Sequence, residues 1–133
     1  MRYLLDTHAF IWATLDTVRL SKKIREIISD RNNEIFVSTV TFWEIALKAS
    51  VKKLTFEKID IKNFPKYAGE MGFTIMEMKE KETITFYELP LKENHRDPFD
   101  RMLIWQAITT DMVLISKDSL IKQYEENGLR TIW

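Results

Sequence analysis

Short apolar runs alternate along this chain with segments in which apolar residues recur every three or four positions. The apolar runs predict buried strands at residues 3–5, 35–37, 73–76, 112–116 and 129–133. The helix-period segments predict helices at about 7–15, from 21, from 38 or 41, at 62–71 and 79–89, from 97 to about 110, and at 119–127. Helices between strands act as crossover connections, so we expect a doubly wound α/β fold with a mostly parallel sheet and helices on both faces.

Residues that favour helix ends support these boundaries. Ser21 is placed to cap the second helix, and either Ser38 or Thr41 to open the third. Asp97 and Pro98 form a strong helix start, because aspartate accepts hydrogen bonds from free amides and proline suits the first helical position. Gly128 predicts the end of the last helix.

Composition indicates a single domain that covers residues 1–133. A chain of this length with 45% hydrophobic residues can bury a core, and only 3 glycines and 3 prolines interrupt it. The lack of cysteine excludes disulfides, thiolate zinc sites and a cysteine nucleophile. The apolar start ends at Asp6, far short of the roughly 20 apolar residues that a membrane span needs. We therefore expect a cytoplasmic protein that does not contact a membrane.

Charge and aromatic content bear on the partners of the protein. The 20 basic and 20 acidic residues give a net charge of zero, so a nucleic acid would be held by local patches and bridging metal rather than by bulk charge. Trp12, Trp43 and Trp105 lie among apolar helix neighbours, where we expect core or dimer-interface positions. The 8 phenylalanines and 4 tryptophans of this small chain favour a homodimer.

Four separated acids, Asp6, Glu44, Asp100 and Asp118, each stand where an apolar segment meets a helix start or turn. Asp6 and Asp118 follow predicted buried strands, and ligands of doubly wound sheets bind beyond the carboxyl ends of the strands. Carboxylates gathered at that edge repel each other unless a cation joins them, and such oxygen ligands suit Mg²⁺ or Mn²⁺. The pattern predicts a metal-dependent phosphodiesterase.

Each acid also has a purely structural interpretation as a helix cap. Those assignments are Asp6 for the first helix, Glu44 in a capping box with Thr41, Asp97 and Asp100 for the long helix, and Asp118 for the last helix. The joint pattern favours a shared cation, because a solitary carboxylate after a buried strand would be desolvated at appreciable cost.

Other chemistries have weaker support in the sequence. His8 and His95 have no histidine four residues away and no cysteine, so zinc is disfavoured and we expect surface or substrate-facing roles. Gly69, Gly72 and Gly128 are too scattered for a phosphate-binding loop, and no serine hydrolase elbow is present.

Four stretches resemble the motifs of PIN-domain ribonucleases, and most closely the VapC-type toxins of type II toxin–antitoxin pairs. They are residues 5–12 (LDTHAFIW), 38–46 (STVTFWEIA), 95–104 (HRDPFDRMLI) and 115–118 (ISKD). The likeness runs over the whole chain in the expected order. It implies a PIN-like doubly wound fold, a homodimer, a Mg²⁺ or Mn²⁺ site, endonucleolytic cleavage of RNA, and a cognate antitoxin protein that blocks the site.

The resemblance also implies roles for individual residues. Asp6, Asp100 and Asp118 match acids that bind metal directly or through water, and Glu44 matches the acid of the third helix, which orients the attacking water or holds a second metal. Three further positions have supporting roles in this interpretation: Asp97 as an extra acid, Ser116 as a hydroxyl that could hold a metal-bound water, and Arg101 as a partner of a carboxylate or of substrate phosphate.

Two alternatives to a ribonuclease remain at this point. Aspartyl-phosphate phosphatases of the doubly wound type also carry an acid after the first strand, but they need a second aspartate two residues later, where this chain has His8. A catalytically inert PIN-like binding module that acts with an antitoxin in repression would keep the fold and lose the chemistry. The intact set of acids favours catalysis.

Overall fold

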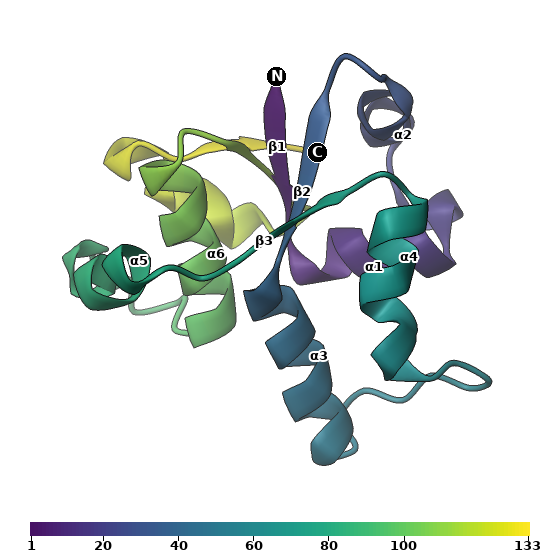
Figure 1. The fold of residues 1–133 in the computed structure, drawn as a ribbon. Coiled ribbons are helices and arrows are strands. Elements are labelled where there is room, and N and C mark those ends of the chain that lie inside the picture. The colour runs from purple at the N-terminus through teal and green to yellow at the C-terminus, as the bar shows by residue number, and fades with distance from the viewer.

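A five-stranded sheet, parallel throughout, forms the centre of the molecule (Figure 1). The computed structural model describes residues 1–133, with strands β1 (Arg2–Leu5), β2 (Glu34–Ser38), β3 (Thr74–Met76), β4 (Val113–Ile115) and β5 (Arg130–Ile132). The strand order is β3-β2-β1-β4-β5, and each neighbouring pair is parallel. The predicted doubly wound α/β fold is confirmed.

Helices connect the strands. They are α1 (Thr7–Leu15), α2 (Lys22–Ser29), α3 (Thr39–Ser50), α4 (Phe64–Glu70), α5 (Glu80–Thr85) and α6 (Pro98–Thr109), with 3₁₀ turns η1 (Thr17–Arg19), η2 (Ile61–Asn63), η3 (Phe86–Glu88) and η4 (Ser119–Asn127). The predicted helix at 79–89 therefore divides into α5 and η3, and the one at 119–127 is a 3₁₀ segment. No helix has the length and apolar character that crossing a membrane requires.

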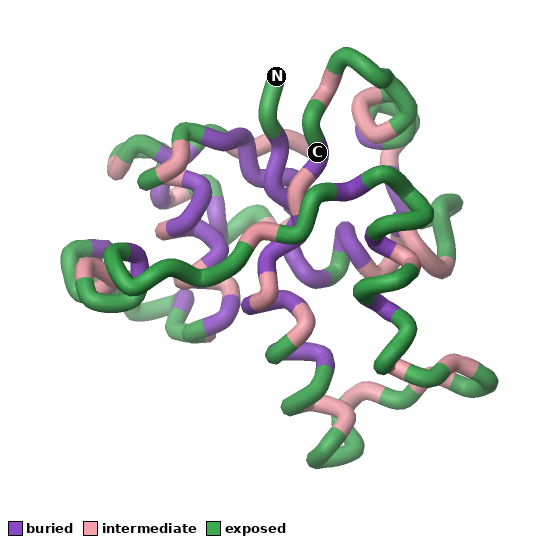
Figure 2. Tube along the Cα trace, in the orientation of Figure 1, coloured by how far each residue is buried: buried purple, intermediate pink, exposed green.

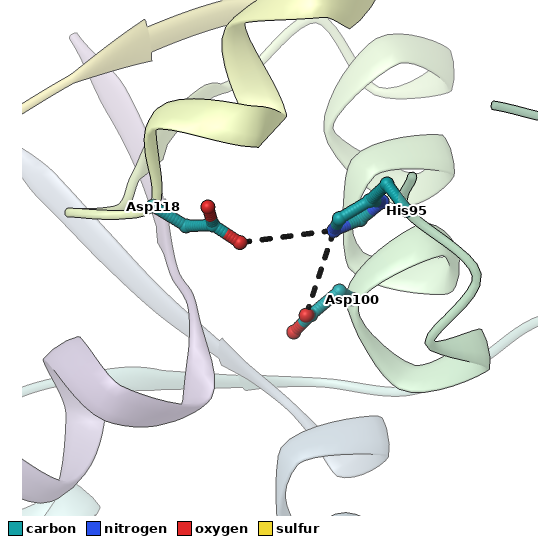
Figure 3. Close-up of side chains that lie close together, drawn as sticks. All are labelled: His95, Asp100 and Asp118. Carbon is teal, nitrogen blue, oxygen red and sulfur yellow. Dashed lines mark ion pairs between the residues drawn. The ribbon is translucent and has the colours of Figure 1, made fainter. Parts of the chain in front are cut away.

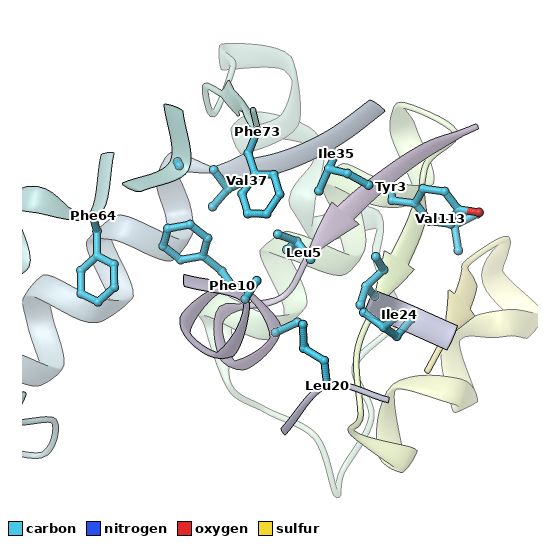
Figure 4. Close-up of a cluster of buried hydrophobic side chains, with 14 of the residues drawn as sticks. Tyr3, Leu5, Phe10, Leu20, Ile24, Ile35, Val37, Phe64, Phe73 and Val113 are labelled. Atoms are coloured by element: carbon cyan, nitrogen blue, oxygen red, sulfur yellow. The ribbon is translucent and has the colours of Figure 1, made fainter. Parts of the chain in front are cut away.

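Each face of the sheet has its own hydrophobic core. On one face, Tyr3 and Leu5 of β1 pack with residues of α1, α2 and α4, as Figure 4 shows for this cluster. On the other face, Leu4 of the same strand packs with residues of α6 and η4. The apolar residues of β1 thus contribute to both cores, because successive side chains of a strand point to opposite faces of the sheet. Figure 2 shows the buried residues concentrated along these strands and the inner sides of the helices.

Local caps define where the helices begin. The Ser21 hydroxyl accepts from the Ile24 amide at 3.2 Å at the start of α2. Ser38, rather than Thr41, caps α3, because its hydroxyl accepts from the Val40 amide at 3.1 Å. Gly128 ends η4 in the left-handed conformation with φ of 96°, which costs glycine little.

The strand order reverses at β1, which lies between β2 and β4. Leu5 of β1 is in register with Ile115 of β4, and the backbone amide of Asp6 donates to the Ile115 carbonyl at 3.1 Å. The residues that follow these two strands therefore leave the sheet side by side. Such a reversal at the carboxyl edge is where doubly wound sheets bind ligands.

Candidate metal centre

Asp6 is held between the end of β1 and the start of α1. Its Oδ1 accepts from the Ala9 amide at 2.8 Å, so the predicted cap is present. The side chain is buried, and burial raises its pKa, although the Ser116 hydroxyl and the Ala9 amide oppose that change. The carboxylate is thus fixed by the helix start and by the Ser116 hydroxyl of the neighbouring strand end.

Asp118 repeats this arrangement at the end of the neighbouring strand β4. Its Oδ1 accepts from the Leu120 amide at 2.9 Å and caps η4. Its own amide donates to the Ser116 hydroxyl at 3.1 Å, which fixes the turn after the strand. Its Oδ2 points toward His95 (Figure 3).

The two acids at the start of α6 differ in their contacts. Asp97 is the cap, with Oδ1 accepting from the Asp100 amide at 3.0 Å. Asp100 lies in the first turn and directs its carboxylate toward His95 and Asp118 (Figure 3). Of the two caps considered for this helix, Asp97 is the one present, and the Asp100 carboxylate caps no amide.

Glu44 lies on α3 and is almost completely buried. Its Oε1 accepts from the Thr7 hydroxyl at 2.6 Å, and its Oε2 forms an ion pair with Lys48, one turn along α3. The expected capping box with Thr41 is absent, because Glu44 points across to α1 instead of back to its own helix start. Both of its oxygens are thus engaged by neighbouring side chains.

The electrostatics of Asp100 show that these acids form one cluster. Burial, together with the negative charges of the neighbouring acids Asp97, Glu44, Asp6 and Asp118, raises the pKa of Asp100 to about 7. Each acid therefore contributes to the same unfavourable field. A cation among them would relieve the repulsion.

His95 completes the cluster from the segment before α6. Its ring is buried, and Nε2 lies 3.6 Å from Asp100 Oδ2 and 3.8 Å from Asp118 Oδ2 (Figure 3). Burial lowers its pKa, while the negative charges of Asp118 and Asp97 act against that shift. Nε2 has no hydrogen-bond partner. The expectation of a surface or substrate-facing position is wrong for His95.

The donor set fits a divalent cation. One ligand atom from each of His95, Asp100 and Asp118 lies within 4.8 Å of the others. The buried imidazole nitrogen beside the two carboxylates has no favourable contact within the protein. An ion bound between them would give it one. Asp6, Asp100 and Asp118 also line one cavity of about 310 Å³, together with His8, Trp12 and Lys117.

The two supporting positions that are not acids are occupied by structural contacts. Ser116 is buried, and its hydroxyl links the acids after β1 and β4, accepting from Asp118 and lowering the pKa of Asp6. Arg101 pairs with no carboxylate. It donates instead to the Leu89 carbonyl at 2.9 Å and to the Pro90 carbonyl at 3.3 Å.

Sequence reasoning missed three residues that hold the site. The ion pair of Lys48 with Glu44 could have been predicted, since a lysine four residues after a glutamate faces it on a helix. No local spacing predicts the other two residues. Thr7 donates to Glu44, and the Tyr124 hydroxyl lies 3.0 Å from His95 Nδ1. Their partners are 37 and 29 residues away, so only the fold brings them together.

Comparison with known proteins places this arrangement in a family. The PIN domain family matches residues 3–127, which is nearly the whole chain. The chain belongs to the PIN domain family. The resemblance noted in the sequence motifs is thereby confirmed, and the cluster of acids lies in a fold that the family shares. No protein of curated function matches the chain by sequence.

Solved structures show the same PIN fold. A chain of the VapBC2 complex of Rickettsia felis, bound to a DNA fragment from its promoter, superposes with a TM-score of 0.70 at 19% identity over 100% of this chain and 99% of that one. Chains of the DNA-bound VapBC of Salmonella typhimurium and of VapBC-1 from nontypeable Haemophilus influenzae each give 0.67 at 18% identity, over 99% and 97%. At these identities the likeness supports the fold.

Proposed function

We propose that this PIN domain is a Mg²⁺- or Mn²⁺-dependent endoribonuclease and the toxin of a VapC-type toxin–antitoxin pair. The observation that carries the proposal is the convergence of Asp6, Asp100 and Asp118 on one cavity from three separate elements. Three carboxylates facing a common space repel one another and have little value for stability, whereas their charge suits a divalent cation, which can in turn bind the anionic phosphodiester.

The residues of the chain divide the work of hydrolysis. Asp6, Asp100 and Asp118 would hold the ion, which when bound supplies positive charge to stabilise the negative charge that develops on the phosphate. Thr7 and Lys48 hold the Glu44 carboxylate in place, and its role in this proposal is to orient the attacking water or to hold a second metal.

Substrate contacts have local sources, since the net charge of the chain is zero. Lys117 lines the cavity beside the acids, with its ammonium 6.0 Å from the Trp12 ring. It offers a positive charge to an RNA phosphate at the place where the cleaved bond would lie.

The experiment is a cleavage assay with purified protein on structured RNAs, with Mg²⁺, with Mn²⁺ and with EDTA. We expect internal cleavage with either metal and none with the chelator, restored when metal is added in excess. Cleavage that continues in EDTA would contradict the mechanism. Metal binding without any RNA cleavage would favour the inert binding module.

The toxin role is supported by the shared fold of the VapBC chains and is tested in cells. Expression of the wild type alone should inhibit growth, and the Asp6→Asn variant, which keeps a side-chain oxygen for the Ala9 amide, should be harmless at equal abundance. Co-expression of the antitoxin, which we expect the neighbouring gene to encode, should restore growth. Equal inhibition by both forms would refute the toxin role.

A further inference from the structure

A metal site made of oxygen ligands alone does not explain why His95 is buried beside the acids of the centre. Its side chain is 4% exposed, yet Nε2 makes no hydrogen bond. The two nearest carboxylate oxygens, on Asp100 and Asp118, are 3.6 Å and 3.8 Å away, beyond hydrogen-bond range. A buried polar nitrogen aimed at a gap between two acids requires a reason.

The hydrogen bonds on the other side of the ring determine what Nε2 presents. The Tyr124 hydroxyl donates to the His95 backbone carbonyl at 3.4 Å. Its oxygen is then left to accept from Nδ1, 3.0 Å away. This network places the imidazole proton on Nδ1, so Nε2 directs a lone pair at two carboxylates. A lone pair facing anions is unfavourable, whereas the same arrangement around a metal ion is favourable.

The spacing suits ligands of one ion. Ligands about 2.1 Å from an octahedral ion are about 3.0 Å apart when adjacent and about 4.2 Å apart when opposite. The distances from Nε2 to Asp100 and Asp118, 3.6 Å and 3.8 Å, exceed the adjacent value by less than 1 Å, so small side-chain movements would bring these atoms to the spacing of adjacent ligands. A ligating histidine also normally donates its other ring nitrogen to a fixed acceptor, which Tyr124 provides here.

We propose that His95 Nε2 is a direct ligand of the ion held by Asp100 and Asp118, and that this nitrogen makes the centre select first-row transition ions, represented by Mn²⁺, over Mg²⁺. Imidazole is a poor ligand for Mg²⁺, which prefers oxygen and water, and a better one for transition ions. The inference rests on the proposed metal-dependent function and adds a ligand and a metal preference to it.

Binding of the metals alone to the full chain tests this without any assay of activity. Calorimetry with Mn²⁺ and with Mg²⁺ gives the ratio of the two affinities, and pulsed EPR of bound Mn²⁺ detects coupling to a ligating nitrogen. We expect nitrogen coupling in the wild type. In His95→Gln the coupling should disappear, and the preference for Mn²⁺ over Mg²⁺ should fall by about tenfold or more.

His8→Gln is the matched control, because His8 lines the cavity of the acids, beside Asp100 and Asp118, and is exposed. It should keep both the coupling and the affinity ratio. Tyr124→Phe removes the acceptor of Nδ1 and keeps the ring, so it should retain the coupling with weaker Mn²⁺ binding. If His95→Gln does not fold, the EPR measurement on His8→Gln alone decides, since His95 is then the only histidine left.

The outcomes separate this inference from the proposed function. Mn²⁺ binding without nitrogen coupling, or an affinity ratio unchanged in His95→Gln, overturns the role of His95 and leaves a carboxylate-bound metal. Absence of any divalent binding overturns the metal-dependent function together with the inference.

Discussion

At the scale of single residues, helix capping and metal binding prove to be compatible roles for the same carboxylate. Asp6 and Asp118 each give Oδ1 to a backbone amide. In Asp118 the other oxygen faces His95, toward the centre. The caps lock the side chains in place, which is what a preorganised ligand needs. The cap interpretation of these two acids is therefore confirmed, and it leaves room for the proposed role as metal ligands.

Asp97 and Asp100 give the sharpest test at this scale. Asp100→Asn removes a carboxylate from a repulsive cluster, so it should nearly abolish cleavage and leave the unfolding temperature of the metal-free protein equal or higher. Asp97→Asn keeps an oxygen for the Asp100 amide and should retain most activity, whereas Asp97→Ala should cost about 0.5–2 kcal/mol of stability.

Cleavage rates and thermal unfolding in EDTA, measured on the same preparations, check this pair. An inactive Asp97→Asn beside an active Asp100→Asn would reverse the assignment.

The pKa of Asp100 predicts how stability depends on pH. Because burial raises this pKa to about 7 from 3.8, the folded protein holds a proton on Asp100 between these values that the unfolded chain has lost. The free energy of unfolding of the metal-free protein should therefore fall as pH rises from about 4 to about 7. The burial of Asp6 acts in the same direction.

Urea unfolding in EDTA at several pH values measures this slope. Asp100→Asn should flatten it, and saturating Mn²⁺ should reverse it, since the ion favours the ionised carboxylates. A wild-type slope that Asp100→Asn leaves unchanged would place the titrating group elsewhere.

At the scale of elements, Arg101 ties the segment before α6 to the helix itself. Its guanidinium donates to the carbonyls of Leu89 and Pro90 and lies 4.9 Å from the Phe86 ring. The chain from Leu89 to Asp97 has little regular structure of its own, and it carries His95. Arg101 thus holds the loop that places the imidazole.

Arg101→Met tests this anchor. It keeps apolar contact with Phe86 but leaves the buried Leu89 carbonyl without its donor, so it should lower the free energy of unfolding by about 1–3 kcal/mol. It should also weaken Mn²⁺ binding by misplacing His95.

Arg96→Met is the control, because Arg96 is exposed and its side chain makes one long hydrogen bond, to the Glu93 carbonyl at 3.4 Å. Denaturation curves and Mn²⁺ titrations of both variants decide. Loss of stability in Arg101→Met with unchanged metal affinity would limit Arg101 to a structural role.

Elements with strong local signals were predictable from sequence, and those that depend on distant partners were not. Buried strands, the Asp97-Pro98 helix start and the Gly128 stop each follow from a few neighbouring residues. The break between α5 and η3 does not, because it follows the packing of Phe86 under Arg101.

The residues of the candidate metal centre also fall into those that the sequence predicts and those that it does not. Asp6 and Asp118 were placed by the rule that parallel strands share a carboxyl edge, whereas the position of His95 depends on its contacts with Tyr124 and Asp118, far along the chain. The spacing rule for zinc sites covers only histidines or cysteines close to His95 in sequence, so it could not find the carboxylates that the fold brings to this ring.

At the scale of the whole molecule, α3 leaves large apolar side chains without cover. Trp43 is 57% exposed, Leu47 44% and Val51, just after the helix, 56%. Their spacing of four residues puts them along one side of α3, and the Trp43 ring packs edge-on against Phe99 of α6 at 4.9 Å. An exposed apolar stripe of this kind is typical of a protein interface.

We predict that a second copy of the chain covers this stripe, which would give the homodimer expected from the aromatic content. Multi-angle light scattering at micromolar concentration should report twice the mass of 15.9 kDa for the wild type. Leu47→Glu puts a charge in the middle of the stripe and should give a monomer with a similar unfolding temperature, because Leu47 packs little within its own chain. Ile84→Glu is the control, since Ile84 is 73% exposed on α5 and lies outside the stripe. A wild type that is monomeric throughout, or a Leu47→Glu variant that still dimerises, would contradict this interface.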